Sequence, residues 1–316
     1  PGSASVRRRR RAHGATDEDD ALPYDILLLA LGARAREAVP GALTFRGPQD
    51  EAALAALLES LRAGRARHVV FAVPAGATWP LPLYELALLT RRHLTDRFVR
   101  GVELTLVTPE DGPLALFGGA ASEALAELFR AHEIDLRTGV RPVEFDGSAL
   151  RVDPDGRIET EHVVALPVLA GPRLPGVPHD EDGFVPTDEF GLVEGLDDVY
   201  AAGDLTQSPV KQGGIATQHA DAAATAIAAR AGAPVTPEPF KPILRGLLLT
   251  GGVPRYLRAD VEDASSTAAA VPLWWPPAKI VGRYLAPFLA ERMGMKEPLS
   301  PEPEFDFVRV EVELDE

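Results

Sequence analysis

The stretch from Val199 to Ala229 limits most strongly what this chain can fold into. A short apolar run ends in Ala202-Gly203-Asp204, a polar loop follows, and the pair Gly213-Gly214 precedes an Ala-rich stretch without Gly or Pro. This order predicts a strand, an acidic residue at its end, a glycine pair, and a helix that begins near Ile215.

Such a layout is suited to holding a polar ligand against the backbone. Two glycines allow a ligand to approach the main chain closely. The first amides of the helix are free donors at the positive end of the helix dipole. The carboxylate of Asp204 can accept a hydrogen bond from a sugar or polyol hydroxyl. The alternative is an ordinary strand-to-helix turn with a surface aspartate.

Composition excludes several classes of function. A chain of 316 residues is long enough for about two domains, and its 46% hydrophobic and 25% charged residues are typical of a globular protein. The net charge of −15 argues against nucleic acid as a partner. The absence of Cys excludes a structural disulfide and thiol redox chemistry in this chain.

The sequence offers no targeting, membrane-spanning or metal-binding signal. No apolar run reaches the roughly 18 residues needed to span a bilayer, and the Arg-rich start lacks an apolar core. The seven His lack the spacing of metal ligands, so no metal site is predicted. A cytoplasmic protein is expected. The basic run from Arg7 to Arg11 is read as a solvated hairpin, with a nucleic-acid or targeting arm as the alternative.

A second stretch, Tyr24 to Ala33, reads YDILLLALGA. Its continuous apolar run predicts a strand buried on both faces, and therefore a parallel sheet.

Together these two stretches resemble the FAD-dependent pyridine nucleotide-disulfide oxidoreductase superfamily, the flavoproteins with two dinucleotide-binding domains. By position, the resemblance implies that Asp204 binds the ribityl chain of FAD and that the following helix points at the flavin ring. It implies further cofactor contacts at the two strand ends and at the start of the helix: Ala30, Gly32, Gly203, Lys211, Gln212, Gly213 and Gly214. FAD is therefore the expected cofactor.

The resemblance also implies a G-x-G-x-x-G motif well upstream of Tyr24, which holds the pyrophosphate of FAD at a helix N-terminus. Only 23 residues precede Tyr24, and they contain no such motif. The chain therefore resembles the superfamily with its amino-terminal part missing, and binding of FAD by this chain alone is expected to be weak.

A strand–helix–strand–helix–strand order follows and predicts a second βαβ unit, which the resemblance identifies with the inserted NAD(P)-binding domain. Its predicted elements are a preceding helix at 51–62, strands at 67–74, 102–108 and 134–138, and helices at 83–97 and 120–131.

The expected phosphate loop of this unit, Val73 to Leu83, is abnormal. It has one glycine, Gly76, where a dinucleotide site uses three, and its prolines at 74, 80 and 82 lack amide donors. NAD(P)H is therefore the less favoured donor, and the pattern is closer to sulfide:quinone oxidoreductase-like members. By position, the resemblance implies a second nucleotide site at Glu85 and Glu110. Trp79 either faces the flavin or caps the loop.

The remaining chain is predicted to return to the FAD domain and then to form a separate C-terminal region. Residues 141–166 read as a hairpin or a strand meander, and Val163 to Val168 is expected to rejoin the FAD sheet. Strands are expected at 243–250 and 305–314, a flexible loop around Ser265 and Thr267, and an amphipathic helix at 278–293. The Trp274-Trp275 region contacts a flavin, a quinone or a bilayer surface on one reading, and a core or dimer interface on the other.

The predicted fold is α/β, with Rossmann-like FAD/NAD(P)-binding domains and a small C-terminal α+β region. The expected domains are a remnant of the first half of the FAD domain at 1–38, the inserted domain at 39–145, the second half of the FAD domain at 146–232, and an interface or acceptor region at 233–316.

The expected function is an FAD-dependent oxidoreductase that passes electrons to a quinone or another acceptor without a redox-active disulfide. The alternative is a non-catalytic or truncated relative that acts as a binding or scaffold module. Peripheral contact with the inner membrane face and a homodimer are further expectations.

Overall fold

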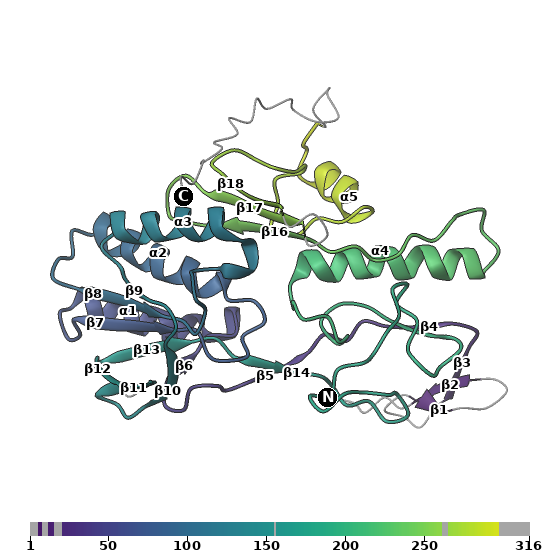
Figure 1. Ribbon diagram of the computed structural model, residues 1–316, viewed down its shortest axis with the longest axis horizontal. Helices are drawn as coiled ribbons and strands as arrows, with labels where there is room; N and C mark the ends of the chain where they lie inside the picture. The colour runs from purple at the N-terminus through teal and green to yellow at the C-terminus, as the bar shows by residue number, and fades with distance from the viewer. Residues whose placement is uncertain (1–5, 8–11, 16–20, 155, 261–264, 297–316) are drawn as a thin grey trace, which may run out of the picture.

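Two lobes and a C-terminal region that lies across both make up the computed structural model (Figure 1). It describes residues 6–7, 12–15, 21–154, 156–260 and 265–296. The lobes are joined by β5 (Arg34–Arg36) and β14 (Val168–Ala170), which pair antiparallel. The chain crosses from the small lobe to the large one along β5 and returns along β14.

A five-stranded parallel sheet forms the centre of the large lobe, in the order β6-β13-β7-β8-β9. Its strands are β6 (Leu43–Thr44), β7 (His68–Ala72), β8 (Glu103–Val107), β9 (Asp135–Arg137) and β13 (His162–Ala165). The helices of this lobe are η1 (Pro48–Asp50), α1 (Glu51–Arg62), α2 (Leu81–Asp96), η2 (Ala115–Phe117) and α3 (Gly119–Ala131). The predicted βαβ unit and its three helices are confirmed.

The two faces of this sheet are covered by different layers. Val69 and Phe71 pack with the buried residues of the three helices, whereas Val70 and Ala72 pack on the other side. That second side is covered by an antiparallel meander of β10 (Arg141–Phe145), β11 (Ala149–Asp153) and β12 (Gly156–Glu159). Because successive side chains of a strand point to opposite faces, the apolar run of β7 is buried on both.

The small lobe is built around two parallel strands and one long helix. The strand β4 (Leu27–Leu29) pairs with β15 (Val199–Ala201), and α4 (Gly213–Arg230) packs beside them. A separate antiparallel sheet contains β1 (Val6–Arg7), β2 (Ala12–Ala15) and β3 (Ala21–Tyr24). β1 and β2 pair antiparallel, but the predicted hairpin falls mostly on residues 8–11, which lie outside the described part.

The prediction that Tyr24 to Ala33 forms a strand buried on both faces is wrong in extent and in burial. Only Leu27–Leu29 is paired with β15, Leu28 is 40% exposed, and Leu31, beyond the strand, is 58% exposed. The physical reason is that side chains of a strand are buried by the layers packed on its two faces: Leu29 belongs to an apolar cluster on one face, whereas Leu28 belongs to neither cluster of this lobe.

The expected return of Val163 to Val168 to the FAD sheet is also wrong. β13 pairs parallel with β6 and β7 and thus completes the sheet of the large lobe. The chain returns to the small lobe only after β13, along β14. The parallel sheet of the large lobe therefore draws its strands from residues 43 to 165.

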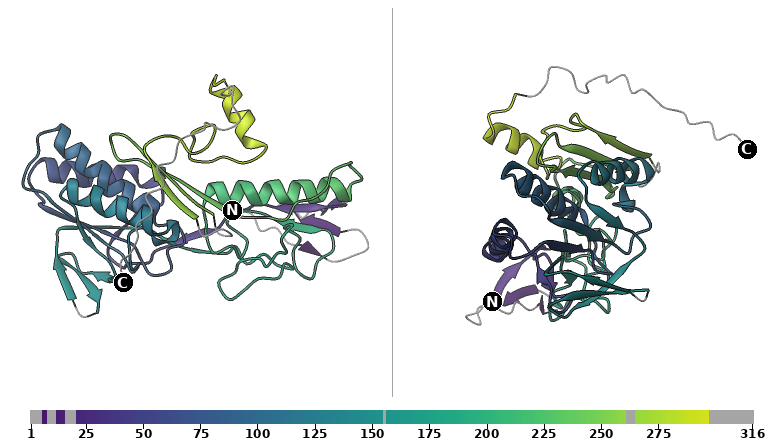
Figure 2. Two further views of the ribbon diagram at one scale, coloured as in Figure 1. Left: turned by 45° about the horizontal axis from the view of Figure 1, so that its top comes forward. Right: turned by 90° about the vertical axis from the view of Figure 1, so that its left-hand side faces the viewer.

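The C-terminal region contains an antiparallel sheet of β16 (Ile243–Leu248), β17 (Arg255–Asp260) and β18 (Ser265–Ala269), followed by α5 (Leu285–Arg292). This sheet packs tightly on the large lobe: a Cβ atom on Gly246 would lie 2.6 Å from Cζ of Phe117 and 2.8 Å from Cδ1 of Leu81. Figure 2 shows the region from two further sides, with α5 at its outer end.

Two predictions for this region are wrong. Ser265 and Thr267, expected in a flexible loop, belong to β18, whose Ser266 hydroxyl donates a hydrogen bond to the carbonyl of Phe117. The helix expected over 278–293 is restricted to Leu285–Arg292. Pro287 falls in its first turn, where the missing amide is tolerated, but a helix extended backwards would place the proline ring against the carbonyl four residues earlier. The strand expected at 305–314 lies outside the described residues.

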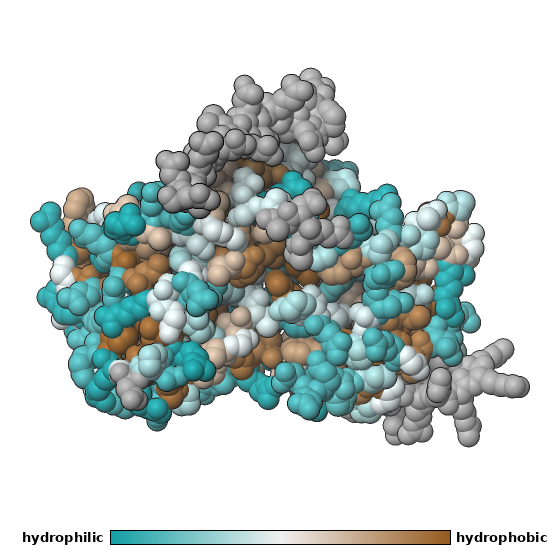
Figure 3. Space-filling model, in the orientation of Figure 1, coloured by the Kyte–Doolittle hydropathy of each residue, from teal (hydrophilic) through white to brown (hydrophobic). Residues whose placement is uncertain are grey.

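The surface reflects this layering. In Figure 3 hydrophilic residues dominate the periphery, and hydrophobic residues are visible across the middle of the face, below the C-terminal region. Within the described part of the chain, no helix is long and apolar enough to cross a membrane.

Candidate functional site

The carboxyl ends of β4 and β15 bring together four of the residues singled out in the sequence. The two strands run parallel with Leu29 opposite Ala201, and the amide of Ala202 donates to the carbonyl of Leu29 at 3.0 Å. The chain therefore leaves both strands at the same edge of the sheet. The predicted contact residues that follow the strand ends at this edge are Ala30, Gly32, Gly203 and Asp204.

Gly203 brings this edge against the first turns of α4. Its φ of 83° lies in the left-handed region that glycine adopts readily. A Cβ atom on Gly203 would lie 3.3 Å from Cβ of Ala216, so a larger residue would push the strand end away from the helix. The sheet edge and the N-terminus of α4 thus form one continuous surface.

Gln212 caps the N-terminus of α4. Its Oε1 accepts from the amide of Ile215 at 2.9 Å, and its Nε2 donates to the carbonyl of Arg245 at 3.1 Å. The cap takes the third helical amide and leaves those of Gly213 and Gly214 at the open start of the helix.

The glycine pair is also required by the packing of the protein itself. A Cβ atom on Gly213 would lie 2.7 Å from Cδ1 of Ile280, and one on Gly214 would lie 2.9 Å from Oε1 of Gln212. Ile280, from the C-terminal region, therefore lies over the start of the helix.

Asp204 is half-buried, and its carboxylate accepts no hydrogen bond from the described residues. Burial raises the pKa of Asp204 above its usual value, and the attraction of Lys211 only partly opposes this effect. A half-buried carboxylate with unused acceptor capacity is suited to receiving donors from a ligand.

Lys211 is the second charged group of the site and is only 5% exposed. Its Nζ donates to the carbonyl of Thr206 and lies 3.7 Å from the ring centroid of Phe184. Burial lowers the pKa of Lys211 to about 8, although Asp204 and Asp180 attract its charge. The ammonium is thus fixed between a carbonyl and an aromatic face.

These residues fit one half of FAD. A ribityl chain carries hydroxyl donors that suit the unpaired carboxylate of Asp204, and the free amides of Gly213 and Gly214 suit ring acceptors. The pyrophosphate half is not fitted by the described residues before Tyr24, which form antiparallel strands and not a strand followed by a helix N-terminus.

Glu85, one of the two acids expected at a second nucleotide site, is bound by the C-terminal region. It is 6% exposed, and both carboxylate oxygens lie 2.6 Å from Nζ of Lys279. Its Oε1 also accepts from the amide of Leu249 at 2.8 Å. Burial raises the pKa of Glu85, and the interactions with Lys279 oppose the shift.

Glu110 holds together the loop that follows β8. Its carboxylate accepts from the hydroxyls of Tyr84 and Thr108, at 2.8 and 2.9 Å, and from the amide of Ala115 at 3.1 Å. Burial and the charge of Glu110 raise the pKa of Tyr84 far above its usual range. A nucleotide site at Glu85 and Glu110 stays a prediction, and both acids already have protein partners.

The aromatic residues left open by the sequence have defined places. Trp79 is partly buried and packs edge-on against Phe117 of the large-lobe core, with ring centroids 5.7 Å apart. Trp274 packs edge-on against Tyr256 at 5.2 Å. Trp274 and Trp275 line a cavity beside α4.

Two further residues of interest, His219 and Lys279, carry no sequence signal. His219 lies 3.9 Å from Phe240 between ring centroids, in the wall of a cavity of about 390 Å³. Burial lowers the pKa of His219 to about 4. Lys279, the partner of Glu85, is distant in the chain, so neither spacing nor periodicity could have paired them.

Comparison with known proteins supports the same class of molecule. The family model described as pyridine nucleotide-disulphide oxidoreductase matches residues 2–228. A search of curated proteins found no match. The family supports FAD as the cofactor, with NAD(P)H as a candidate donor.

Solved structures show the same fold at low identity. The sulfide:quinone oxidoreductase of Aquifex aeolicus is 18% identical with a TM-score of 0.73, over 85% of this chain and 70% of that one. A ferredoxin reductase of Rhodopseudomonas palustris is 20% identical with a TM-score of 0.59, over 80% of this chain and 62% of that one. An NAD-dependent persulfide reductase of A. fulgidus is 16% identical with a TM-score of 0.59, over 84% of this chain and 49% of that one.

Proposed function

We propose that this chain, which belongs to the pyridine nucleotide-disulphide oxidoreductase family, is an FAD-dependent oxidoreductase that passes electrons to a quinone or another acceptor. The observation that carries the proposal is the carboxylate of Asp204, half-buried at the carboxyl edge of two parallel strands and without a hydrogen-bond donor among the described residues. Ligands of open α/β sheets bind at this edge of the strands.

The residues of the site would bind and orient the cofactor. Asp204 would accept hydrogen bonds from the ribityl hydroxyls, and the amides of Gly213 and Gly214 would donate to the ring edge. Lys211 supplies a fixed positive charge near Asp204. Bound FAD supplies the hydride and electron transfer itself. The chain would act without a redox-active disulfide, because it contains no Cys.

The donor and the acceptor are inferred from the large lobe and the C-terminal region. Pro74, Pro80 and Pro82 leave few amides for a pyrophosphate, which disfavours NAD(P)H as the donor. A quinone is the favoured acceptor. Exposed side chains near α5, namely Ile280, Tyr284, Phe288 and Met293, support peripheral membrane contact or a homodimer interface. A location at the inner membrane face is part of the same proposal.

The decisive experiment compares flavin affinity between Asp204→Ala and the natural sequence. Loss of a hydrogen bond to a charged group costs roughly 1.5–3 kcal/mol, so affinity should fall about 10- to 100-fold for both FAD and riboflavin. The two ligands share the ribityl chain, and calorimetric titration measures both. We also expect riboflavin to bind about as tightly as FAD, because the described residues offer no cradle for the pyrophosphate.

Asp198→Ala is the matched control, because Asp198 directly precedes β15 and pairs with Arg230 on the surface. It should leave flavin affinity unchanged. If Asp204→Ala also leaves the affinity unchanged and its circular dichroism is that of the natural sequence, Asp204 is not the ribityl ligand.

A non-catalytic binding or scaffold module is the second candidate. It is favoured by Ile280, which lies over the start of α4 where a flavin ring would approach the glycine pair. Flavin-loaded protein that reduces no quinone with any hydride donor would support this module over the oxidoreductase.

A further inference from the structure

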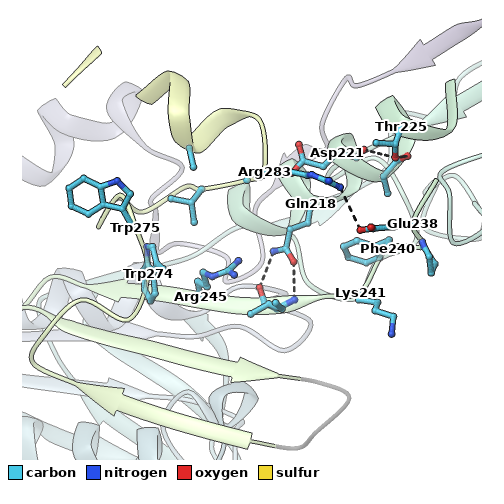
Figure 4. A pocket seen from close by; sticks show the side chains of 16 residues that line it. Gln218, Asp221, Thr225, Glu238, Phe240, Lys241, Arg245, Trp274, Trp275 and Arg283 are labelled. Atoms are coloured by element: carbon cyan, nitrogen blue, oxygen red, sulfur yellow. Dashed lines mark hydrogen bonds and ion pairs between the residues drawn. The ribbon is translucent and has the colours of Figure 1, made fainter. Parts of the chain in front are cut away.

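A cavity of about 610 Å³ lies between α4, β16 and residues 274–286, and the proposed function does not use it. Figure 4 shows the side chains that line it. Pockets of roughly 300–1,000 Å³ are typical of sites for small organic molecules. The question is which chemistry its walls would recognise.

One wall is aromatic and held in place. The indole nitrogen of Trp274 donates to the carbonyl of Ala278 at 3.0 Å, and the ring of Trp274 meets that of Tyr256 at 72°. Trp275 is the next residue and is half-buried. Fixed aromatic faces of this kind favour a planar, apolar ligand group.

Most charged and polar groups of the lining already have protein partners. Arg283 pairs with Glu238 at 3.5 Å, and the backbone amide of Arg283 donates to Asp221 at 2.6 Å. Gln218 donates to the carbonyl of Ile243 and accepts from its amide, both at 2.9 Å. Lys241 also has an interaction partner.

Arg245 is the exception. Its Nε atom is buried and has no hydrogen-bond partner among the described residues. Burial lowers the pKa of Arg245 below its ordinary value, repulsion by Arg258 adds to the shift, and attraction by Asp260 opposes it. In Figure 4 its guanidinium lies between Trp274 and Gln218, inside the cavity.

We propose that this cavity binds a small aromatic carboxylate, with the carboxylate on the guanidinium of Arg245 and the ring against Trp274 and Trp275. The planar guanidinium offers paired donors that match the two oxygens of a carboxylate. A ligand of this class pairs with the guanidinium of Arg245 at the cavity wall and covers the tryptophans at the same time. The site does not depend on flavin binding.

Calorimetry with benzoate, benzyl alcohol and inorganic phosphate separates the contributions of the ring and of the charge. Benzoate should bind once per chain, and benzyl alcohol and phosphate should each bind at least about 10-fold more weakly. Arg245→Gln should weaken benzoate about 10- to 100-fold. Trp275→Leu should weaken benzoate as well, and NMR saturation transfer should detect the ring protons of bound benzoate only where the site is intact.

Arg258→Gln is the matched control, because Arg258 is the cross-strand partner of Arg245 on β17 and does not line the cavity. It should retain benzoate binding. If Arg245→Gln fails to fold, Arg245→Lys keeps the charge without the paired donors and should still weaken benzoate. Absence of benzoate binding to the natural sequence, equal binding of benzyl alcohol or phosphate, or full binding by a folded Arg245 variant would overturn the proposal.

Discussion

At the scale of single residues, the site at the carboxyl edge of β4 and β15 carries electrostatic strain that a ligand would relieve. Asp204 is half-buried without a donor, and Lys211 is buried with a pKa of about 8. Burial is the largest cause of both pKa shifts. The charged form of each side chain is therefore less stable in the folded protein than in water. Groups arranged for a ligand are commonly left in this state.

Asp204→Asn should therefore stabilise the flavin-free protein at neutral pH. The pKa of Asp204 in the folded protein is raised above its ordinary value of 3.8. The favourable contribution of Asp204 to the free energy of unfolding is therefore fully present below pH 3.8, and it is lost as the pH rises through the folded-state pKa. At neutral pH the charged carboxylate lowers stability, and the neutral amide removes this effect. Thermal unfolding should show a higher midpoint for the variant at neutral pH and a difference that shrinks towards pH 3.8.

The half-buried Asp198 again provides the control, since Asp198→Asn removes a surface ion pair with Arg230 and should not raise the midpoint. An Asp204→Asn protein that is less stable than the natural sequence without flavin would contradict this account of the site.

At the scale of elements, α4 connects the candidate site to the C-terminal region. Its N-terminal cap, Gln212, is at the same time a contact to β16, and further along the helix Gln218 binds both the amide and the carbonyl of Ile243. The start of the helix, and with it the free amides of Gly213 and Gly214, is thus positioned by β16.

Gln212→Ala should lower the free energy of unfolding by about 1 kcal/mol, the usual effect of losing an N-cap side chain. The amide of Ile215 would lose its acceptor, and the carbonyl of Arg245 would lose a donor. Urea unfolding measures the change, and hydrogen exchange at Ile215 should become faster.

Gln207→Ala is the comparison for this experiment, because Gln207 is exposed on the preceding loop. It should leave both measurements unchanged. Unaltered exchange at Ile215 in the Gln212→Ala protein would show that the cap does not hold the helix start.

At the scale of the whole molecule, the C-terminal region fastens the two lobes together. Its sheet packs on Phe117 and Leu81 of the large lobe and on α4 of the small lobe. The ion pair of Glu85 with Lys279 adds one charged contact to this apolar interface, with Glu85 buried and Lys279 44% exposed on its side chain.

Lys279→Met should destabilise the protein by about 1–2 kcal/mol, less than the loss of a fully buried pair because the lysine is partly solvated. The buried carboxylate of Glu85 would keep only the amide of Leu249 as a partner. Limited proteolysis should cut the segment around 270–284 faster than in the natural sequence. Urea unfolding should measure the loss in the free energy of unfolding.

The double variant Glu85→Gln with Lys279→Met tests whether the unpaired carboxylate of Glu85 causes the loss of stability in Lys279→Met. A neutral amide can still accept from Leu249 and needs no counter-charge, so the double variant should be more stable than Lys279→Met alone. If it is equally unstable, the loss comes from the packing of the lysine stem and not from the unpaired carboxylate.

The sequence by itself determined the elements whose pattern is local. The helical spacing of Leu54, Leu57, Leu58 and Leu61 gave α1 with its observed bounds, and the apolar runs gave β7 and β8 within two residues. The order of strand, Asp204, glycine pair and helix was correct for the same reason: each signal lies within a few residues of the next.

Tertiary structure alone decided the pairings between distant segments. β13 joined the large sheet beside β7, Ser265–Ala269 became a strand because β17 and Phe117 bind it, and Lys279 reached Glu85 across the interface. Periodicity reports which face of an element is apolar, but it does not report which partner covers that face. That choice depends on how the whole chain packs. It placed Ile280 over the start of α4, where the candidate site lies, and it brought the carbonyl of Arg245 to the side chain of Gln212.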